Sequence, residues 1–74
     1  MDLLDIFRRG LQDLYKLPLK ERIVYAEIEH SLPLKAKYAV LDHKWDPEQQ
    51  FKAAIKAANG KLPKQKEDGK IIWE

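Results

Sequence analysis

The sequence predicts a mainly helical protein of about four helices that ends in a short β-hairpin. Three observations support this fold class. Residues 46–60 contain a helix start, an apolar stripe and a helix stop. A Leu-Pro-Leu-Lys motif occurs at residues 17–20 and again at 32–35, and Asp68-Gly69 precedes a strand-like segment at 70–73. With 74 residues, we expect one small domain, residues 1–74.

The first helix is expected at residues 2–16. Asp2 is a suitable N-cap residue. Apolar residues then recur at close to helical spacing, at Leu3, Phe7, Leu11 and Leu14. Gly10 lies inside this segment, where glycine lowers helix stability by about 1 kcal/mol relative to alanine.

The repeated motif predicts two further helices, at about 19–30 and 34–44. The copies are fifteen residues apart, and this offset aligns two sets of residues. The sets are Leu19, Ile23, Ala26 and His30, and Leu34, Tyr38, Leu41 and Trp45. Each set is spaced i, i+4, i+7, i+11, so each lies on one helical face. A proline just inside each start is typical of a helix beginning.

A strand interpretation of the same region stays open. Val24, Ala26 and Ile28 alternate with polar or half-polar residues, as a half-buried strand would. Residues 22–29 and 36–43 would then form a hairpin, and the protein would have an αββαβ fold. Strong helix formers at residues 20–22 favour the helical interpretation.

The fourth helix is expected at 47–59. Asp46 is a suitable N-cap, Pro47 suits the first helical position, and Gln49 could complete a capping box. Asn59 and Gly60 can adopt the left-handed conformation that ends a helix. The apolar stripe consists of Phe51, Ala54, Ile55 and Ala58.

The C-terminal residues predict a β-hairpin. Asp68-Gly69 favours a tight turn, and residues 70–73 have strand composition. Residues 62–66 could pair with them, although Pro63 restricts that strand to an edge. We expect the hairpin to pack on the helices through Ile72 or Trp73. Helices followed by such a hairpin resemble a winged helix-turn-helix in outline, which implies no function by itself.

Composition limits the classes of protein to consider. The chain has no cysteine, so it has neither disulfides nor thiolate metal ligands. No apolar run approaches the roughly 20 residues of a membrane helix. The first residues carry acids where a signal peptide carries basic residues. We therefore expect a cytoplasmic protein with no membrane contact, and so small a core makes homodimerisation possible.

Catalytic residue types are scarce, and no catalytic residue is assigned. Ser31 is the only serine, and its neighbour His30 is adjacent in sequence, a poor geometry for a nucleophile and its base. His30 and His43 lack the spacing of a metal motif. The three glycines are too far apart for a phosphate-binding loop. The prediction is a non-enzymatic protein without metal or cofactor.

The strongest functional indication is a basic segment. Residues 49–66 contain five lysines and no acid, a local charge of +5 against +2 for the whole chain. Lysines on a helix face and after its end can contact phosphates, and amide side chains can contact base edges. We therefore predict a DNA- or polyanion-binding accessory module. Its candidate binding residues are Gln49, Lys52, Lys56, Asn59, Lys61, Lys64 and Lys66.

The alternative is a protein-interaction module, a small regulator or inhibitor that docks on a larger protein. Aromatic side chains are frequent anchors of protein interfaces, and the candidates are Tyr25, Trp45 and Trp73. Core positions are nevertheless expected for Tyr38 and Trp45, with Trp45 packing on the first turn of the fourth helix. The position of Trp73 is open.

Overall fold

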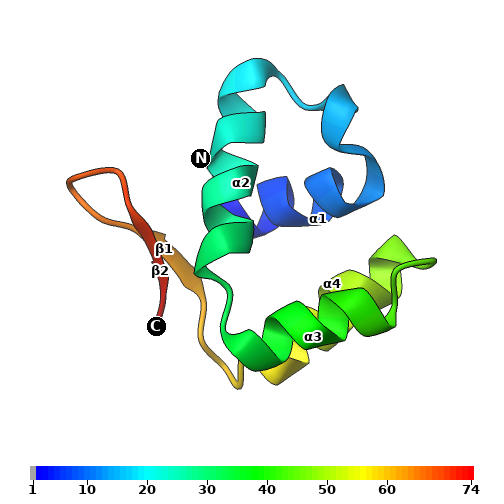
Figure 1. Ribbon diagram of the computed structural model, residues 1–74. Coiled ribbons are helices and arrows are strands. Elements are labelled where there is room, and N and C mark those ends of the chain that lie inside the picture. The colour runs from blue at the N-terminus through cyan, green and yellow to red at the C-terminus, as the bar shows by residue number, and fades with distance from the viewer. Residues whose placement is uncertain (1) are drawn as a thin grey trace.

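The computed structural model describes residues 2–74, which form four α-helices, one short 3₁₀ helix and a two-stranded sheet (Figure 1). The elements are α1 (Leu3–Asp13), η1 (Leu14–Lys16), α2 (Leu19–Ser31), α3 (Leu34–Asp42), α4 (Pro47–Ala57), β1 (Pro63–Gln65) and β2 (Ile71–Trp73). The predicted fold class is confirmed. The αββαβ alternative is wrong, because both segments that it assigns to strands lie in α2 and α3.

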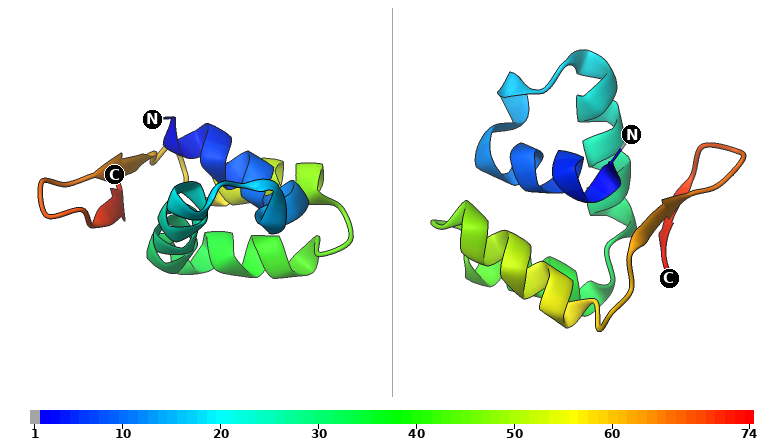
Figure 2. Two further views of the ribbon diagram at one scale, coloured as in Figure 1. Left: turned by 90° about the horizontal axis from the view of Figure 1, so that it is seen from above. Right: turned by 180° about the vertical axis from the view of Figure 1, so that it is seen from behind.

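The helices form two layers. α2 and α3 lie in front of α1 and α4 in Figure 1, and the view from above in Figure 2 shows the same separation. α1 packs against α2 and α4, and α3 packs against α4. α2 and α3 meet only at a corner near Leu32 and Pro33, so that they form an L. The hairpin stands beside the lower end of α2.

The core is centred on Phe7, which is fully buried. Its ring lies 6.2 Å from that of Tyr25, 5.9 Å from Phe51 and 6.0 Å from Trp73, measured between centroids. α1, α2, α4 and β2 each contribute one of these rings. The remaining buried apolar residues close around them: Ile6, Leu17, Ile28, Leu32, Ala36, Ala54, Ala58 and Ile71. Offset and edge-to-face rings of this kind add to the stability gained from burial.

α1 begins and ends at capping aspartates. The Asp2 carboxylate accepts hydrogen bonds from the backbone N–H groups of Leu4 and Asp5, as predicted. The α-helix ends at Asp13 rather than at residue 16, and Asp13 accepts from the N–H of Tyr15. The chain tightens there into η1. An aspartate that accepts a hydrogen bond from the backbone N–H two residues later favours a turn over a continued helix.

The Leu-Pro-Leu-Lys repeat has the same local structure at both sites. Pro18 and Pro33 have nearly equal φ angles of −56° and −55°, and each occupies the N-cap position, one residue before the predicted place. The first leucine of each motif is buried. The second, Leu19 and Leu34, is 66% and 65% exposed. The repeat thus starts both helices with one leucine turned into the core and one turned outward.

α4 begins at Pro47 as predicted and ends at Ala57, two residues before the predicted end at 59. The Asp46 carboxylate accepts from the N–H of Gln49 at 3.3 Å. The reciprocal bond of a capping box is absent within residues 2–74, because the Asp46 N–H donates instead to the carbonyl of His43 at 2.9 Å. Asn59 and Gly60 have φ angles of 57° and 83°, the left-handed stop expected after this helix.

The hairpin forms in the predicted place and is attached to α2. β1 and β2 are antiparallel, with Lys64 opposite Ile72. Ile71 and Trp73 are buried, whereas Ile72 points to the other face and is half-buried. The Trp73 indole N–H lies 3.1 Å from the Ser31 hydroxyl, which itself donates to the carbonyl of Ile28 at 2.9 Å. The hairpin therefore packs on the helices through Trp73, one of the two residues expected to do so, and through Ile71 in place of Ile72.

Candidate functional site

A basic groove lies between the start of α3 and the end of α4. Lys35, Lys56 and Lys61 line it, together with Asn59 and with apolar residues of α3 and α4. The groove has a volume of about 840 Å³, and none of the residues lining it carries a carboxylate. Three ammonium groups from three segments therefore border one concave surface, without an acid to neutralise them there.

The fold explains why these lysines converge. Lys56 lies about half a turn of α4 away from Ala54 and Ala58, which are buried. The left-handed turn at Asn59 and Gly60 then redirects the chain and places Lys61 at the same end of the helix. Lys35 comes from the first turn of α3, which packs on α4. No side chain caps this end of α3, and free N–H groups at a helix start add positive potential.

The structure brings together only part of the predicted binding set. Lys56, Asn59 and Lys61 line the groove, and Lys35, absent from the predicted set, joins them. No sequence pattern placed Lys35 there, because its position depends on the packing of α3 against α4. The other members lie outside the groove lining: Gln49, Lys52, Lys64 and Lys66.

Two of the outlying lysines have acidic neighbours. The Lys66 ammonium lies 3.4 Å from the Glu74 carboxylate, across the hairpin. Lys52 is close enough to Glu48 that its charge contributes to lowering the pKa of that carboxyl. Their positive potential toward a ligand is therefore reduced, in contrast to that of the groove lysines.

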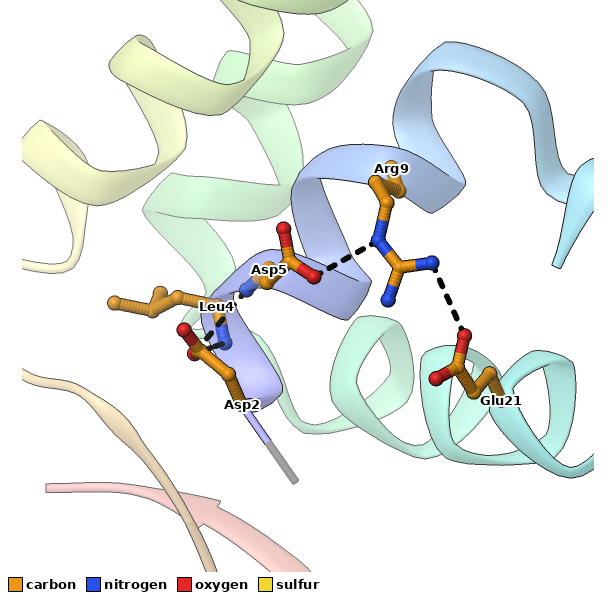
Figure 3. Close-up of polar contacts among 5 residues, drawn as sticks. All are labelled: Asp2, Leu4, Asp5, Arg9 and Glu21. Atoms are coloured by element: carbon orange, nitrogen blue, oxygen red, sulfur yellow. Dashed lines mark hydrogen bonds and ion pairs between the residues drawn. The ribbon is translucent and has the colours of Figure 1, made fainter.

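The arginines of α1 are used in ion pairs that join helices. The Arg8 guanidinium lies 2.9 Å from Glu48 in α4. Arg9 lies 2.8 Å from Asp5 in its own helix and 3.2 Å from Glu21 in α2, and Figure 3 shows its side chain reaching between the two acids. Hydrogen bonds to these acids raise the pKa of both arginines. Neither arginine lines the basic groove.

Two of the three predicted interaction residues are buried. Tyr25 is 7% exposed and Trp73 8%, and both belong to the core, so the structure corrects their predicted role as surface anchors. Burial, reinforced by the nearby charge of Glu29, raises the pKa of the Tyr25 hydroxyl. The sequence alone could not show whether these two aromatic residues are surface anchors or core residues, because the contacts with Phe7 that bury them form only in the folded protein.

Trp45 is the exposed member of the set. It is 88% exposed, with the Lys44 ammonium 5.1 Å from its ring centre. The expectation that Trp45 and Tyr38 lie in the core is wrong, since Tyr38 is 58% exposed. Trp45 therefore does not pack on the first turn of α4.

A second surface feature is apolar. The outward sides of α2 and α3 carry five exposed side chains, Leu19, Ile23, Leu34, Tyr38 and Leu41. At the corner between the two helices lies a groove of about 410 Å³. It is lined by apolar and by polar side chains, Leu32, Val40 and Leu41 together with Glu29, His30 and Lys37. This surface, defined by the five exposed side chains and the corner groove, is called the outer face below.

Catalytic and metal-binding features are sparse in residues 2–74. No group of three His, Cys, Asp or Glu side chains there could hold a metal ion. Ser31 is engaged by Trp73 and by Ile28. His30 and His43 are both exposed, at the end of α2 and after α3. Of the helices in these residues, none combines the length and apolar character that a bilayer-spanning segment requires.

Comparisons with protein-family models, with curated proteins and with solved structures find no match for this chain.

Proposed function

We propose that this protein is a non-enzymatic module that binds the phosphate backbone of duplex DNA through the basic groove. One observation carries the proposal: Lys35, Lys56 and Lys61 border a concave surface that no carboxylate lines. The mechanism is electrostatic. The ammonium groups of the groove neutralise DNA phosphates and so release the cations condensed on them, and this release supplies the binding free energy.

The arrangement predicts modest affinity with little sequence preference. Three lysines can neutralise about three phosphates, which gives a slope of roughly −2.7 when log K is plotted against log salt concentration. Asn59 is the one amide side chain in the groove. A single such group contributes little discrimination between bases, because direct readout uses several bidentate contacts.

The test is a titration of the protein into a labelled random-sequence duplex, followed by fluorescence anisotropy at two salt concentrations. We expect binding near the micromolar range at about 50 mM salt, and about fortyfold weaker binding at about 200 mM. Lys35→Glu and Lys56→Glu should each abolish measurable binding. Lys16→Glu, on η1, changes the net charge equally and should bind like the wild type.

Two outcomes would contradict the proposal. One is the absence of binding at low salt, and the other is equal loss in the groove variants and in Lys16→Glu, which would indicate a diffuse net-charge effect. Linear polyphosphate serves as a competitor. Displacement of DNA at equal phosphate concentration would show that the groove recognises polyanions in general rather than duplex geometry.

A second candidate function is protein interaction, the alternative predicted from the aromatic residues. The specific observation that favours it is the outer face, together with Trp45 at its far end. Monomeric proteins seldom expose contiguous apolar surface of this extent without an interaction. If the groove variants bind DNA as the wild type does, protein interaction becomes the better supported function.

A further inference from the structure

We infer that the outer face is the interface of a symmetric homodimer, in which α2 of one copy packs antiparallel on α3 of the other. The inference does not rest on DNA binding, although the outer face shares Leu34 with the basic groove. It rests on three features: where the exposed apolar residues lie on their helices, how much surface they leave uncovered, and how the surrounding charges are distributed.

The exposed apolar residues lie opposite the core side of each helix. In α2, Tyr25 and Ile28 are buried, and Leu19, Ile23, Ala26 and His30 are exposed about half a turn away. In α3, Ala36 is buried, and Leu34, Tyr38 and Leu41 are exposed. Both helices belong to the front layer (Figures 1 and 2). Their outward sides therefore form one surface of the molecule.

The uncovered area matches that of a stable interface. The five apolar side chains of the outer face keep between 58% and 66% of their surface exposed, and Trp45 keeps 88%. Together these six leave on the order of 800 Å² uncovered, which is about what each partner contributes to a standard-size interface. A chain of 74 residues has a small core, so burying this surface would raise its stability appreciably.

Because of the repeat, the exposed residues of α2 and those of α3 have the same spacing. They can therefore pair along the whole length when the two helices run in opposite directions. Consider a twofold axis in the plane of the outer face that bisects the angle between α2 and α3. Rotation about this axis places α2 of the second copy over α3 of the first, and α3 over α2. It places α2 antiparallel on α3 of the second copy, with both corners at the same end. The apolar pairs are then Leu19 with Trp45, Ile23 with Leu41 and Ala26 with Tyr38, and the polar His30 lies opposite Leu34. Tyr38, an aromatic residue, would lie opposite Ala26, the smallest residue of the α2 stripe.

The charges that flank the stripes are also complementary in this arrangement. Within one chain, Glu29 near the end of α2 and Lys37 near the start of α3 both line the corner groove. The twofold axis places Glu29 beside Lys37 of the second copy. On the opposite side of the stripes, it places Lys20 near Asp42. Charge complementarity of this kind selects the register of an interface.

Two neighbouring residues, Leu34 and Lys35, connect the dimer to the basic groove. Glu27 lies on the same side of α2 as Lys20, and the axis brings it near Lys35 of the second copy. Lys35 also lines the basic groove. Glu29 and Lys37 do not line that groove. Variants at these two positions therefore test the dimer without altering the DNA-binding surface.

The first experiment is sedimentation velocity on the full chain over a range of concentrations. We expect a concentration-dependent dimer in the wild type, and at least a hundredfold weaker dimer in Tyr38→Glu, because a central aromatic side chain is lost from both copies. Tyr38 is exposed, so the variant should keep its helical circular dichroism. Lys52→Gln, on the back layer, changes the net charge by the same amount and should dimerise like the wild type.

A charge exchange tests the register. Glu29→Lys and Lys37→Glu should each weaken the dimer about tenfold, because each places like charges together at two symmetric sites. An equimolar mixture of the two variants should regain the wild-type dimer constant, since both pairs become opposite again in the mixed dimer. A partner other than a second copy would not give this recovery.

Three results would overturn the inference. The first is a wild type that stays monomeric at all concentrations up to about 1 mM. The second is a dimer that persists in Tyr38→Glu, which would place the interface elsewhere. The third is a mixture of Glu29→Lys and Lys37→Glu that dimerises no better than either variant alone, which would exclude the antiparallel register.

Discussion

The ring of Tyr25 in α2 lies directly against the backbone of Gly10 in α1. A methyl group added to Gly10 would come within 2.8 Å of three carbons of that ring. Gly10 is buried, and its lack of a side chain lets the two helices approach closely enough for Tyr25 to stack on Phe7. The glycine that weakens α1 as an isolated helix is therefore required by its packing.

Gly10→Ala is expected to destabilise the protein. The new methyl group would displace Tyr25 from Phe7, and overpacking of this kind typically costs about 1–3 kcal/mol, more than the helix-propensity gain of about 1 kcal/mol. Urea unfolding followed by circular dichroism measures the change. In a Tyr25→Leu background the same substitution should cost much less. An increase in stability in the wild-type background would contradict this account.

The leucines of the repeat should divide into two classes. Leu17 and Leu32 are buried, so Leu17→Ala and Leu32→Ala should each lower the free energy of unfolding by about 2–5 kcal/mol. Leu19 and Leu34 are exposed, so their alanine variants should change it by no more than about 0.5 kcal/mol in dilute protein. Thermal unfolding of the four variants checks this. Similar losses at all four sites would show that the second leucines are also covered in the monomer.

Much of the fold could be predicted from local sequence. Asp2, Asp46 and the Asn59-Gly60 pair act within a few residues of themselves, so the start of α1 and the start and stop signals of α4 follow from backbone chemistry alone. The apolar stripe of α4 faces inward as its period indicates. The Asp68-Gly69 turn also forms where its conformational preference places it.

The burial of α2 and α3 could not be predicted in the same way. Each has apolar residues on two opposite faces, so periodicity identifies a stripe but not which stripe meets the core. Tyr38 illustrates the problem: it belongs to a regular apolar series and is nevertheless exposed. Lys35 illustrates it for the candidate site, because its place beside Lys56 depends on a contact between two helices.

Removal of the Trp73 ring should detach the hairpin. The indole packs edge-on against Phe7 and donates its N–H to the Ser31 hydroxyl. Trp73→Ala should lower stability by about 3–5 kcal/mol, which is close to the whole stability expected for a core this small. Trp73→Phe keeps a ring but loses the donor, and should cost less.

The fluorescence of Trp73 gives a direct measure of docking. In a Trp45→Phe background, Trp73 is the only indole, and its emission should be blue-shifted while the hairpin is packed. Ser31→Ala leaves the indole N–H with only the longer contact to the Ile28 carbonyl, 3.4 Å, and should cost about 1 kcal/mol. Emission typical of solvent-exposed tryptophan in the folded Trp45→Phe protein would contradict the docked hairpin.

The ion pair between Arg8 and Glu48 should make stability depend on acid pH. A hydrogen bond from Arg8, reinforced by the Arg8 charge and by Gln12, lowers the pKa of Glu48 below its ordinary value of 4.5. As the pH falls, the unfolded chain therefore binds this proton before the folded chain does. The stabilisation is complete above the ordinary pKa and is lost as the pH falls through the lowered pKa. Urea unfolding at pH 7 and at about pH 3 should thus show a smaller loss for Glu48→Gln than for the wild type.

Matched variants distinguish the contribution of the Arg8–Glu48 ion pair from the general loss of stability at low pH. Glu67→Gln removes a carboxylate that forms no ion pair within residues 2–74, and its loss of stability between the two pH values should equal that of the wild type. Arg8→Met should behave like Glu48→Gln, and the double variant should show no further change, because either substitution alone removes the same interaction. Additive effects of Arg8→Met and Glu48→Gln would mean that the two side chains act independently, and that the acid sensitivity arises elsewhere in the protein.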